Sequence, residues 1–213
     1  MAQKSIFFDL DGTLTDSGEG IINCASLALE HFGLPVPSRE EMRVFVGPPL
    51  DQMFVKYGVP AHKTDEAIAV FRSRYVPIGI LENYPYEGIR ELLEKLKAAG
   101  HRLFVATSKP EEMALQVLDR FELSGYFEKI CGASLDRTRI EKADVIAYLL
   151  TQAGSVENTV MVGDTAFDVL GAAHHGIGTI GVTWGYGEEK DMVAAGAIAI
   201  AHTPEELLHL LTT

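Results

Sequence analysis

Two carboxylates stand one residue apart where a short apolar run near the start of the chain ends. Residues 5–10 are apolar on both faces and predict a buried strand. Residues two apart in a strand point to the same side, so Asp9 and Asp11 are expected to project together. Gly12 then allows the backbone to turn tightly. Because two crowded acids repel each other and resist burial while charged, the pair predicts a bound cation and a charged substrate.

Polar groups that follow two later strands are expected to join this pair. Residues 101–107 and 159–162 predict buried strands, so Thr107 and Asp164 lie at or just past a strand end. Ligands of parallel sheets bind beyond the carboxyl ends of the strands, and we expect these side chains to converge there. Asp168 follows one helical turn later. Carboxylate ligands without cysteine or histidine favour Mg²⁺ over zinc.

A phosphate group is the natural partner of such a magnesium site, because Mg²⁺ binds one or two carboxylates together with substrate phosphate oxygens. The hydroxyl of Thr107 and the backbone N–H groups around Ser108 could bind the other phosphate oxygens. A positive charge is still needed, and Lys142 is the candidate. It starts a predicted helix over 142–153, where the helix dipole disfavours a cation unless an anion lies nearby.

The order of the predicted elements indicates an α/β fold. Strands are predicted over residues 5–10, 101–107, 130–133, 159–162, 179–182 and 198–201. Helices alternate with them, which predicts a doubly wound, Rossmann-like parallel sheet covered on both faces. Strand signals are nearly absent over residues 16–82, where helical spacing and a Ser38/Glu41 capping box indicate several helices. We therefore expect a catalytic core from residues 1–15 and 83–213, and an inserted all-helical cap domain over 16–82.

The composition is that of an average soluble globular chain, with 213 residues, 47% of them hydrophobic and 23% charged. The net charge of −12 and the lack of a basic stripe argue against a nucleic-acid polymer as partner. Cys24 and Cys131 form no paired motif, which favours the reducing cytoplasm. Neither a signal peptide nor a membrane span is indicated. We expect a cytoplasmic monomer or weak homodimer that acts on a small molecule.

Four segments resemble, in order, the motifs of the haloacid dehalogenase-like hydrolase superfamily. Asp9–Leu14 is similar to the first motif, Ala106–Pro110 to the second, Lys142 to the third and Gly163–Asp168 to the fourth. The helical insert falls where this superfamily places its cap domain, so the resemblance covers nearly the whole chain. Residues 46–50 and 183–187 look most like the branch of phosphoglycolate phosphatases and 5′-nucleotidases.

The resemblance implies a Mg²⁺-dependent phosphatase that works through a phosphoaspartate. Asp9 would attack phosphorus, and Asp11 would protonate the leaving alkoxide and later take a proton from water. Asp9, Asp164 and the carbonyl of Asp11 would hold Mg²⁺, while Asp168 would bind metal-coordinated water or orient Asp164. The implied catalytic residues are Asp9, Asp11, Thr107 and Lys142, the substrate-binding residues Gly12, Thr107, Ser108, Lys109 and Lys142, and the metal-binding residues Asp9, Asp11, Asp164 and Asp168.

The third motif leaves one alternative open. Many relatives have a proline after the motif lysine, whereas Ala143 follows Lys142, and Arg137 and Arg139 lie close by. The position at the start of a helix favours Lys142. A comparison of Lys142 and Arg139 variants distinguishes the two assignments.

The substrate and the reaction class also leave alternatives open. A substrate such as phosphoglycolate would need a cation for its carboxylate, for which Lys109, Arg43 or Lys56 could serve. A nucleotide would need an apolar or aromatic surface such as Phe45 or Tyr86. A phosphomutase would share the same machinery. A dehalogenase is disfavoured because such relatives lack the second acid, and a phosphoryl-accepting receiver module because its acceptor follows a middle strand and no cap interrupts it.

Overall fold

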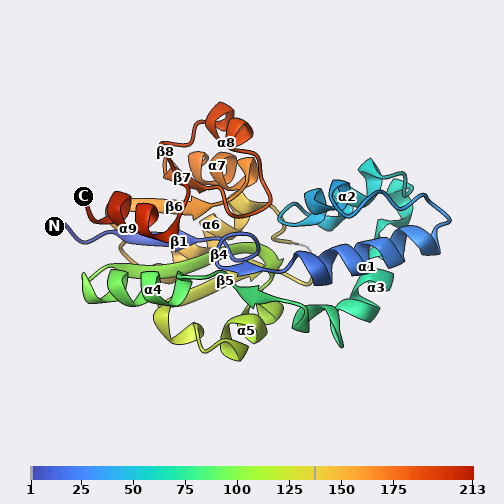
Figure 1. Cartoon of the computed structure of the whole chain (residues 1–213), viewed down its shortest axis with the longest axis horizontal. Helices are drawn as coiled ribbons and strands as arrows, with labels where there is room; N and C mark the ends of the chain where they lie inside the picture. The colour runs from blue at the N-terminus through green and yellow to red at the C-terminus, as the bar shows by residue number, and fades with distance from the viewer. Residues whose placement is uncertain (1, 137) are drawn as a thin grey trace.

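A parallel sheet of six strands forms the centre of the computed structural model, which describes residues 2–136 and 138–213 (Figure 1). β1 (Ser5–Phe8) lies in the middle, with β4 (Arg102–Pro110) on one side and β6 (Thr159–Gly163) on the other. Beyond them follow β5 (Lys129–Ala133) on the first side, and β7 (Gly178–Val182) and β8 (Ala199–Ala201) on the second. The chain thus changes direction across the sheet at β1, and α/β sheets bind ligands at such a switch point.

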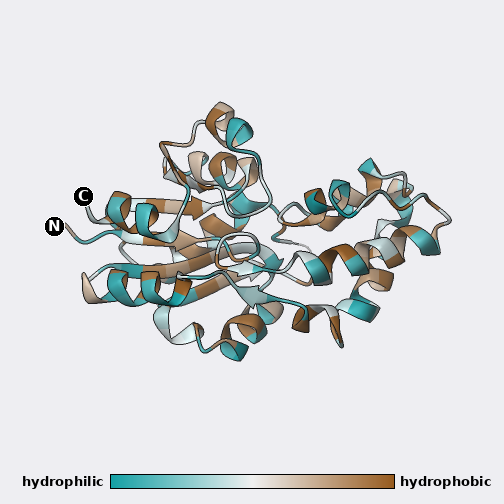
Figure 2. Ribbon diagram, in the orientation of Figure 1, coloured by the Kyte–Doolittle hydropathy of each residue, from teal (hydrophilic) through white to brown (hydrophobic). Residues whose placement is uncertain are grey.

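Helices cover both faces of this sheet. The side chains of β1 alternate, so that Ile6 and Phe8 enter one hydrophobic core and Phe7 enters the other. The first face is covered by α4 (Ile89–Ala98), α5 (Glu111–Arg120) and α9 (Pro204–Thr212), and the second by α6 (Lys142–Ala153) and α7 (Ala166–Ala173). The strands between these layers are mostly hydrophobic (Figure 2). The predicted doubly wound α/β fold is therefore confirmed.

Helical structure fills the stretch between β2 (Thr15–Asp16) and β3 (Tyr84–Pro85), two short strands that pair antiparallel. The stretch contains α1 (Gly18–His31), α2 (Leu50–Lys56) and α3 (Thr64–Tyr75), with 3₁₀ turns at Glu41–Phe45, Ala61–Lys63 and Gly79–Leu81. It projects from one end of the sheet (Figure 1). This is where the sequence places a cap domain, and the boundaries at residues 16 and 82 stay a prediction.

Three details differ from the expected elements. β1 ends at Phe8 rather than Leu10, because the following backbone turns tightly around the carbonyl of Leu10. β4 continues to Pro110, which is in an extended conformation, rather than ending at Thr107. The helix α8 (Glu189–Ala195) is not predicted, because its seven residues are too few to display a helical stripe. Within the described ranges, the helices are all too short or too polar to cross a membrane.

Candidate active site

The carboxyl ends of β1, β4 and β6 bring the polar residues singled out in the sequence to one edge of the sheet. Asp9 follows β1, Thr107 lies in the last part of β4, and Asp164 follows β6. Lys142 is the first residue of α6, and Asp168 lies in the first turn of α7. All of these side chains are buried. They meet because neighbouring parallel strands end at the same edge.

Lys142 lies at the centre of the charges at this edge. Its Nζ lies 2.8 Å from Asp9 Oδ1 and 2.7 Å from Asp168 Oδ1, and it donates a hydrogen bond of 2.9 Å to the carbonyl of Ala106. Two acids and one carbonyl thus match the three donors of the ammonium group. Burial alone would lower the pKa of Lys142, but the charges of Asp168 and Asp9 outweigh it and hold that pKa above its ordinary value.

The alternative cation of the third motif points elsewhere. Arg139 Nε donates a hydrogen bond of 2.7 Å to the carbonyl of Gly132, and its Nη2 lies 3.2 Å from Glu111 Oε2. Arg137 lies outside the described residues. Of Lys142 and Arg139, it is therefore Lys142 that contacts the acids at the strand ends.

Three buried carboxylates lie close enough together to hold a metal ion. Oxygen atoms of Asp9, Asp164 and Asp168 lie within 4.8 Å of one another. Burial raises the pKa of Asp9 to about 6, although the charge of Lys142 counteracts the effect. Burial, followed by the charges of Asp168 and Asp9, raises the pKa of Asp164 well above its usual range. An all-oxygen cluster whose charges are disfavoured in this way fits a hard divalent cation.

Asp164 is oriented by the loops that follow β1 and β7. Thr13 Oγ1 donates a hydrogen bond of 3.1 Å to its Oδ1, and the backbone N–H of Tyr186 donates one of 2.8 Å to its Oδ2. A Cβ atom at Gly12 or Gly185 would collide with this carboxylate, so both loops approach it through glycine. The resemblance implies that Gly12 binds substrate. The structure shows in addition that a larger residue at this position would collide with Asp164.

Asp168 divides its two oxygens between a helix cap and the lysine. Oδ2 accepts hydrogen bonds from the backbone N–H and from Oγ1 of Thr165, at 3.1 and 2.9 Å. The bond from the backbone N–H is one half of the capping box that opens α7, and in the other half the Thr165 side chain accepts from the backbone N–H of Asp168. Oδ1 faces Lys142. The cap therefore fixes the orientation of the acid that Lys142 contacts.

Asp11 has a separate cation. Lys109 Nζ lies 2.8 Å from Asp11 Oδ1 and 2.7 Å from Oδ2, and both side chains are buried. The backbone N–H of Lys109 also donates a hydrogen bond of 3.2 Å to Thr107 Oγ1. The sequence offers Lys109 as a partner for a substrate carboxylate, whereas the structure pairs it with Asp11. The two residues are 98 positions apart, so no local pattern signals this contact.

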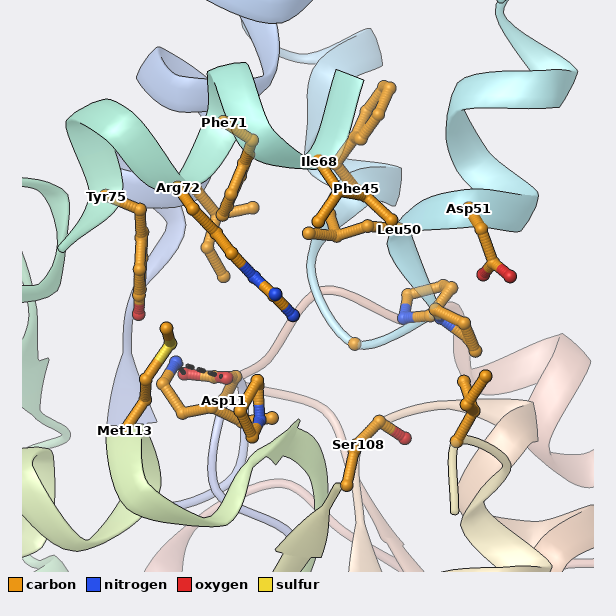
Figure 3. Close-up of a pocket in the computed structure, with 18 of the residues that line it drawn as sticks. Asp11, Phe45, Leu50, Asp51, Ile68, Phe71, Arg72, Tyr75, Ser108 and Met113 are labelled. Atoms are coloured by element: carbon orange, nitrogen blue, oxygen red, sulfur yellow. Dashed lines mark hydrogen bonds and ion pairs between the residues drawn. The ribbon is translucent and has the colours of Figure 1, made fainter. Parts of the chain in front are cut away.

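A pocket lies above Asp11, between the sheet and the helical stretch (Figure 3). Asp11 and Ser108 form part of its floor, and Lys109, which contacts Asp11, also lines the pocket. Its opposite wall is one face of α3, whose lining residues are Ile68, Phe71, Arg72 and Tyr75. No sequence motif marks Arg72 or Tyr75 as a residue of the site. Their helical spacing from Ile68 and Phe71 is the signal that could have placed them there.

The other sequence candidates for substrate binding lie away from this pocket. The guanidinium carbon of Arg43 lies 5.1 Å from the centroid of the Tyr186 ring, and Arg43 Nη2 donates a hydrogen bond of 3.1 Å to the carbonyl of Gly185. Tyr86 lines the same separate groove as Arg43. Lys56 is exposed on α2. Phe45, by contrast, does line the pocket above Asp11.

The doubly wound sheet, with its acids and lysines at the carboxyl ends of the strands, defines an α/β protein with a candidate site for a metal and an anion. The family model of the haloacid dehalogenase-like hydrolases matches residues 6–182. The chain belongs to this family.

Several relatives are similar over nearly the whole chain. A 5′-nucleotidase of Pseudomonas aeruginosa is 41% identical over 192 residues, which cover 89% of this chain and 87% of that protein. The tyrosine-protein kinase PtkA of Mycobacterium tuberculosis is 43% identical over 209 residues, which cover 97% of this chain and 72% of that protein. A phosphoglycolate phosphatase of Caulobacter vibrioides is 31% identical over an alignment of 220 residues, which covers 98% of this chain and 92% of that protein. The crystal structure of a predicted phosphatase from Clostridium acetobutylicum superimposes with a TM-score of 0.95 at 37% identity, covering 99% of each chain.

We expect the substitution Asp164→Asn to stabilise the metal-free protein at neutral pH. Because folding raises the pKa of Asp164, the folded protein retains a proton at this carboxyl to a higher pH than the unfolded chain does. Stability therefore falls as the pH rises from the unfolded pKa through the folded one. The amide has no charge to bury and still accepts a hydrogen bond from Tyr186.

Urea unfolding in the presence of a chelator measures this effect. The variant should be more stable than the wild type at about pH 8, and the difference should shrink as the pH falls below about 3, where the carboxyl is largely protonated in both states. A variant that is less stable at both values would contradict the assignment.

Proposed function

We propose that this chain is a Mg²⁺-dependent phosphatase that hydrolyses small phosphate monoesters through a phosphoaspartate on Asp9. The observation that carries the proposal is the contact of Lys142 with Asp9 and Asp168 at the edge of the sheet. A buried carboxylate beside an ammonium group is suited to attack an anionic phosphate, because the cation offsets part of the repulsion. Membership of the family and the names of several relatives support the same reaction.

The acids of the site fit a magnesium ion. Asp9, Asp164 and Asp168 supply three buried carboxylates within 4.8 Å, and this cluster includes no thiol or imidazole among the described residues. Such a donor set suits a hard cation rather than zinc. We expect Asp9, Asp164 and the carbonyl of Asp11 to hold the ion, with Asp168 beside them. When bound, Mg²⁺ would supply positive charge that offsets the charges of Asp9 and of the phosphate.

The residues have separate tasks in the proposed reaction. Asp9 attacks phosphorus, and the bond between phosphorus and the alkoxide oxygen breaks as the phosphoaspartate forms. Asp11 gives a proton to the leaving oxygen and later takes one from the water that hydrolyses the intermediate. Thr107 and Lys142 stabilise the charge on the transferring group, and the N–H groups around Ser108 bind its oxygens.

A phosphoglycolate-like ester is the proposed substrate, and a nucleoside monophosphate is the second candidate. The relationship to phosphoglycolate phosphatases supports the first. The 41% identity to a 5′-nucleotidase and the apolar side chains of Phe45, Leu50 and Ile68 in the pocket favour the second. A β-phosphoglucomutase-like phosphomutase would use the same acids. The net charge of −12 supports a small substrate over a nucleic-acid polymer, and the cytoplasm is the proposed location.

Release of inorganic phosphate from a panel of phosphate monoesters tests this function. With Mg²⁺ we expect steady turnover of p-nitrophenyl phosphate and of at least one natural ester, with a kcat of roughly 1–10³ s⁻¹ for the preferred substrate. A chelator should abolish the turnover. A single stoichiometric burst would indicate a receiver-type acceptor instead, and transfer within a sugar phosphate would indicate a mutase. A protein that releases no phosphate from any ester contradicts the proposal.

Lys142 and Arg139 form a matched pair for testing the third motif. The substitution Lys142→Gln should lower kcat for p-nitrophenyl phosphate by roughly 10²–10³-fold, since it removes the charge that contacts Asp9. Arg139→Gln should retain turnover near that of the wild type, because this guanidinium contacts Glu111 and Gly132. Thermal melting shows whether both variants are folded. If the arginine substitution costs far more turnover, the assignment of Lys142 is wrong.

A further inference from the structure

One face of α3 forms the wall of the pocket opposite Asp11. Ile68, Phe71, Arg72 and Tyr75 are spaced by three and four residues, so they share this face of the helix. Two of them are apolar, and the other two carry polar groups at their tips. Figure 3 shows the guanidinium of Arg72 and the hydroxyl of Tyr75 directed from α3 toward the floor that contains Asp11. The polar part of this wall therefore faces the residue proposed to protonate the leaving group.

Tyr75 carries a buried hydroxyl group beside the ammonium group of Lys109. The residue is 3% exposed, and its hydroxyl donates no hydrogen bond among the described residues. Because an ammonium group can only donate, the O–H of Tyr75 remains suited to a ligand that offers an acceptor. The Tyr75 ring lies 5.1 Å, centroid to Nζ, from Lys109, and Lys109 contacts both oxygens of Asp11. Tyr75 thus lies beside the ion pair formed by Lys109 and Asp11, the residue proposed to protonate the ester oxygen.

Two positively charged side chains line the pocket among the described residues, one from the sheet and one from α3. Among the described residues that line it, the cations are Lys109 and Arg72. Lys109 directs its ammonium group at Asp11, which leaves it poorly placed for a second carboxylate. Arg72 extends into the pocket from the same helical face as Tyr75 (Figure 3). A guanidinium presents paired N–H donors that match the two oxygens of a carboxylate.

We propose that Arg72 and Tyr75 determine specificity by binding a carboxylate on the leaving group, close to the ester oxygen. The substrate class is therefore the phosphate esters of short hydroxy acids, and this inference rests on the proposed phosphatase function. Phe45, Leu50 and Ile68 leave room for a small apolar substituent on the same leaving group. This assignment moves carboxylate recognition from the motif residue Lys109 to the helical stretch.

Two substrates test the contribution of the carboxylate to binding. Ethyl phosphate has a methyl group where 2-phosphoglycolate has the carboxylate, and the two esters are otherwise the same. The wild type should prefer 2-phosphoglycolate. Arg72→Gln and Tyr75→Phe should each lower kcat/KM for this substrate by roughly 10- to 100-fold, mainly through KM, and change the value for ethyl phosphate much less. Arg72→Lys should fall between Arg72→Gln and the wild type, because it keeps the charge and loses the paired donors.

Two further variants of the same helical stretch serve as controls. Lys56→Gln removes an exposed cation and Tyr57→Phe a hydroxyl outside the pocket lining, and both should keep the wild-type preference. Equal losses with both substrates, or no loss with either, in Arg72→Gln and Tyr75→Phe would overturn the inference. So would a wild type that turns over ethyl phosphate as well as 2-phosphoglycolate. A wild type that hydrolyses neither these esters nor p-nitrophenyl phosphate would instead contradict the proposed function.

Discussion

The contact of one buried lysine with two buried acids is the constraint on which the rest of this site depends. Lys142 lies between Asp9 and Asp168, and all three side chains are withdrawn from water. Buried charges are tolerated only when they are paired, and removal of one partner leaves the other uncompensated. The third acid, Asp164, adds a charge that the lysine does not contact in the described structure. The excess of negative charge is what makes a divalent cation the expected additional component.

A second lysine repeats this arrangement on the side of the helical stretch. Lys109 pairs with Asp11, and its ammonium group lies near the ring of Tyr75 on α3. The sheet thus supplies most of the charged groups, whereas α3 supplies the pocket wall opposite Asp11.

The sequence was sufficient for the parts that follow from strand periodicity and strand ends. Asp9 and Asp164 each follow a buried strand directly, and Thr107 lies in the last part of β4. Because parallel strands end at one edge, the proximity of these residues could be predicted. The start of α6 placed Lys142 for a similar reason. The contact between Lys109 and Asp11 could not be predicted, because it joins distant segments through side-chain rotamers. The position of the Tyr75 hydroxyl could not be predicted either, because only the placement of α3 opposite Asp11 and Lys109 shows that it faces the pocket.

The central claim is that Asp9, with its charge balanced in a buried site, accepts the phosphoryl group. The most direct measurement is peptide mapping by mass spectrometry after the protein has turned over p-nitrophenyl phosphate with Mg²⁺ and has been quenched in acid. The account predicts one added phosphoryl group on the peptide that contains Asp9, and its absence together with loss of turnover in Asp9→Asn. A phosphoryl group on another residue, or undiminished phosphate release by Asp9→Asn, would contradict it.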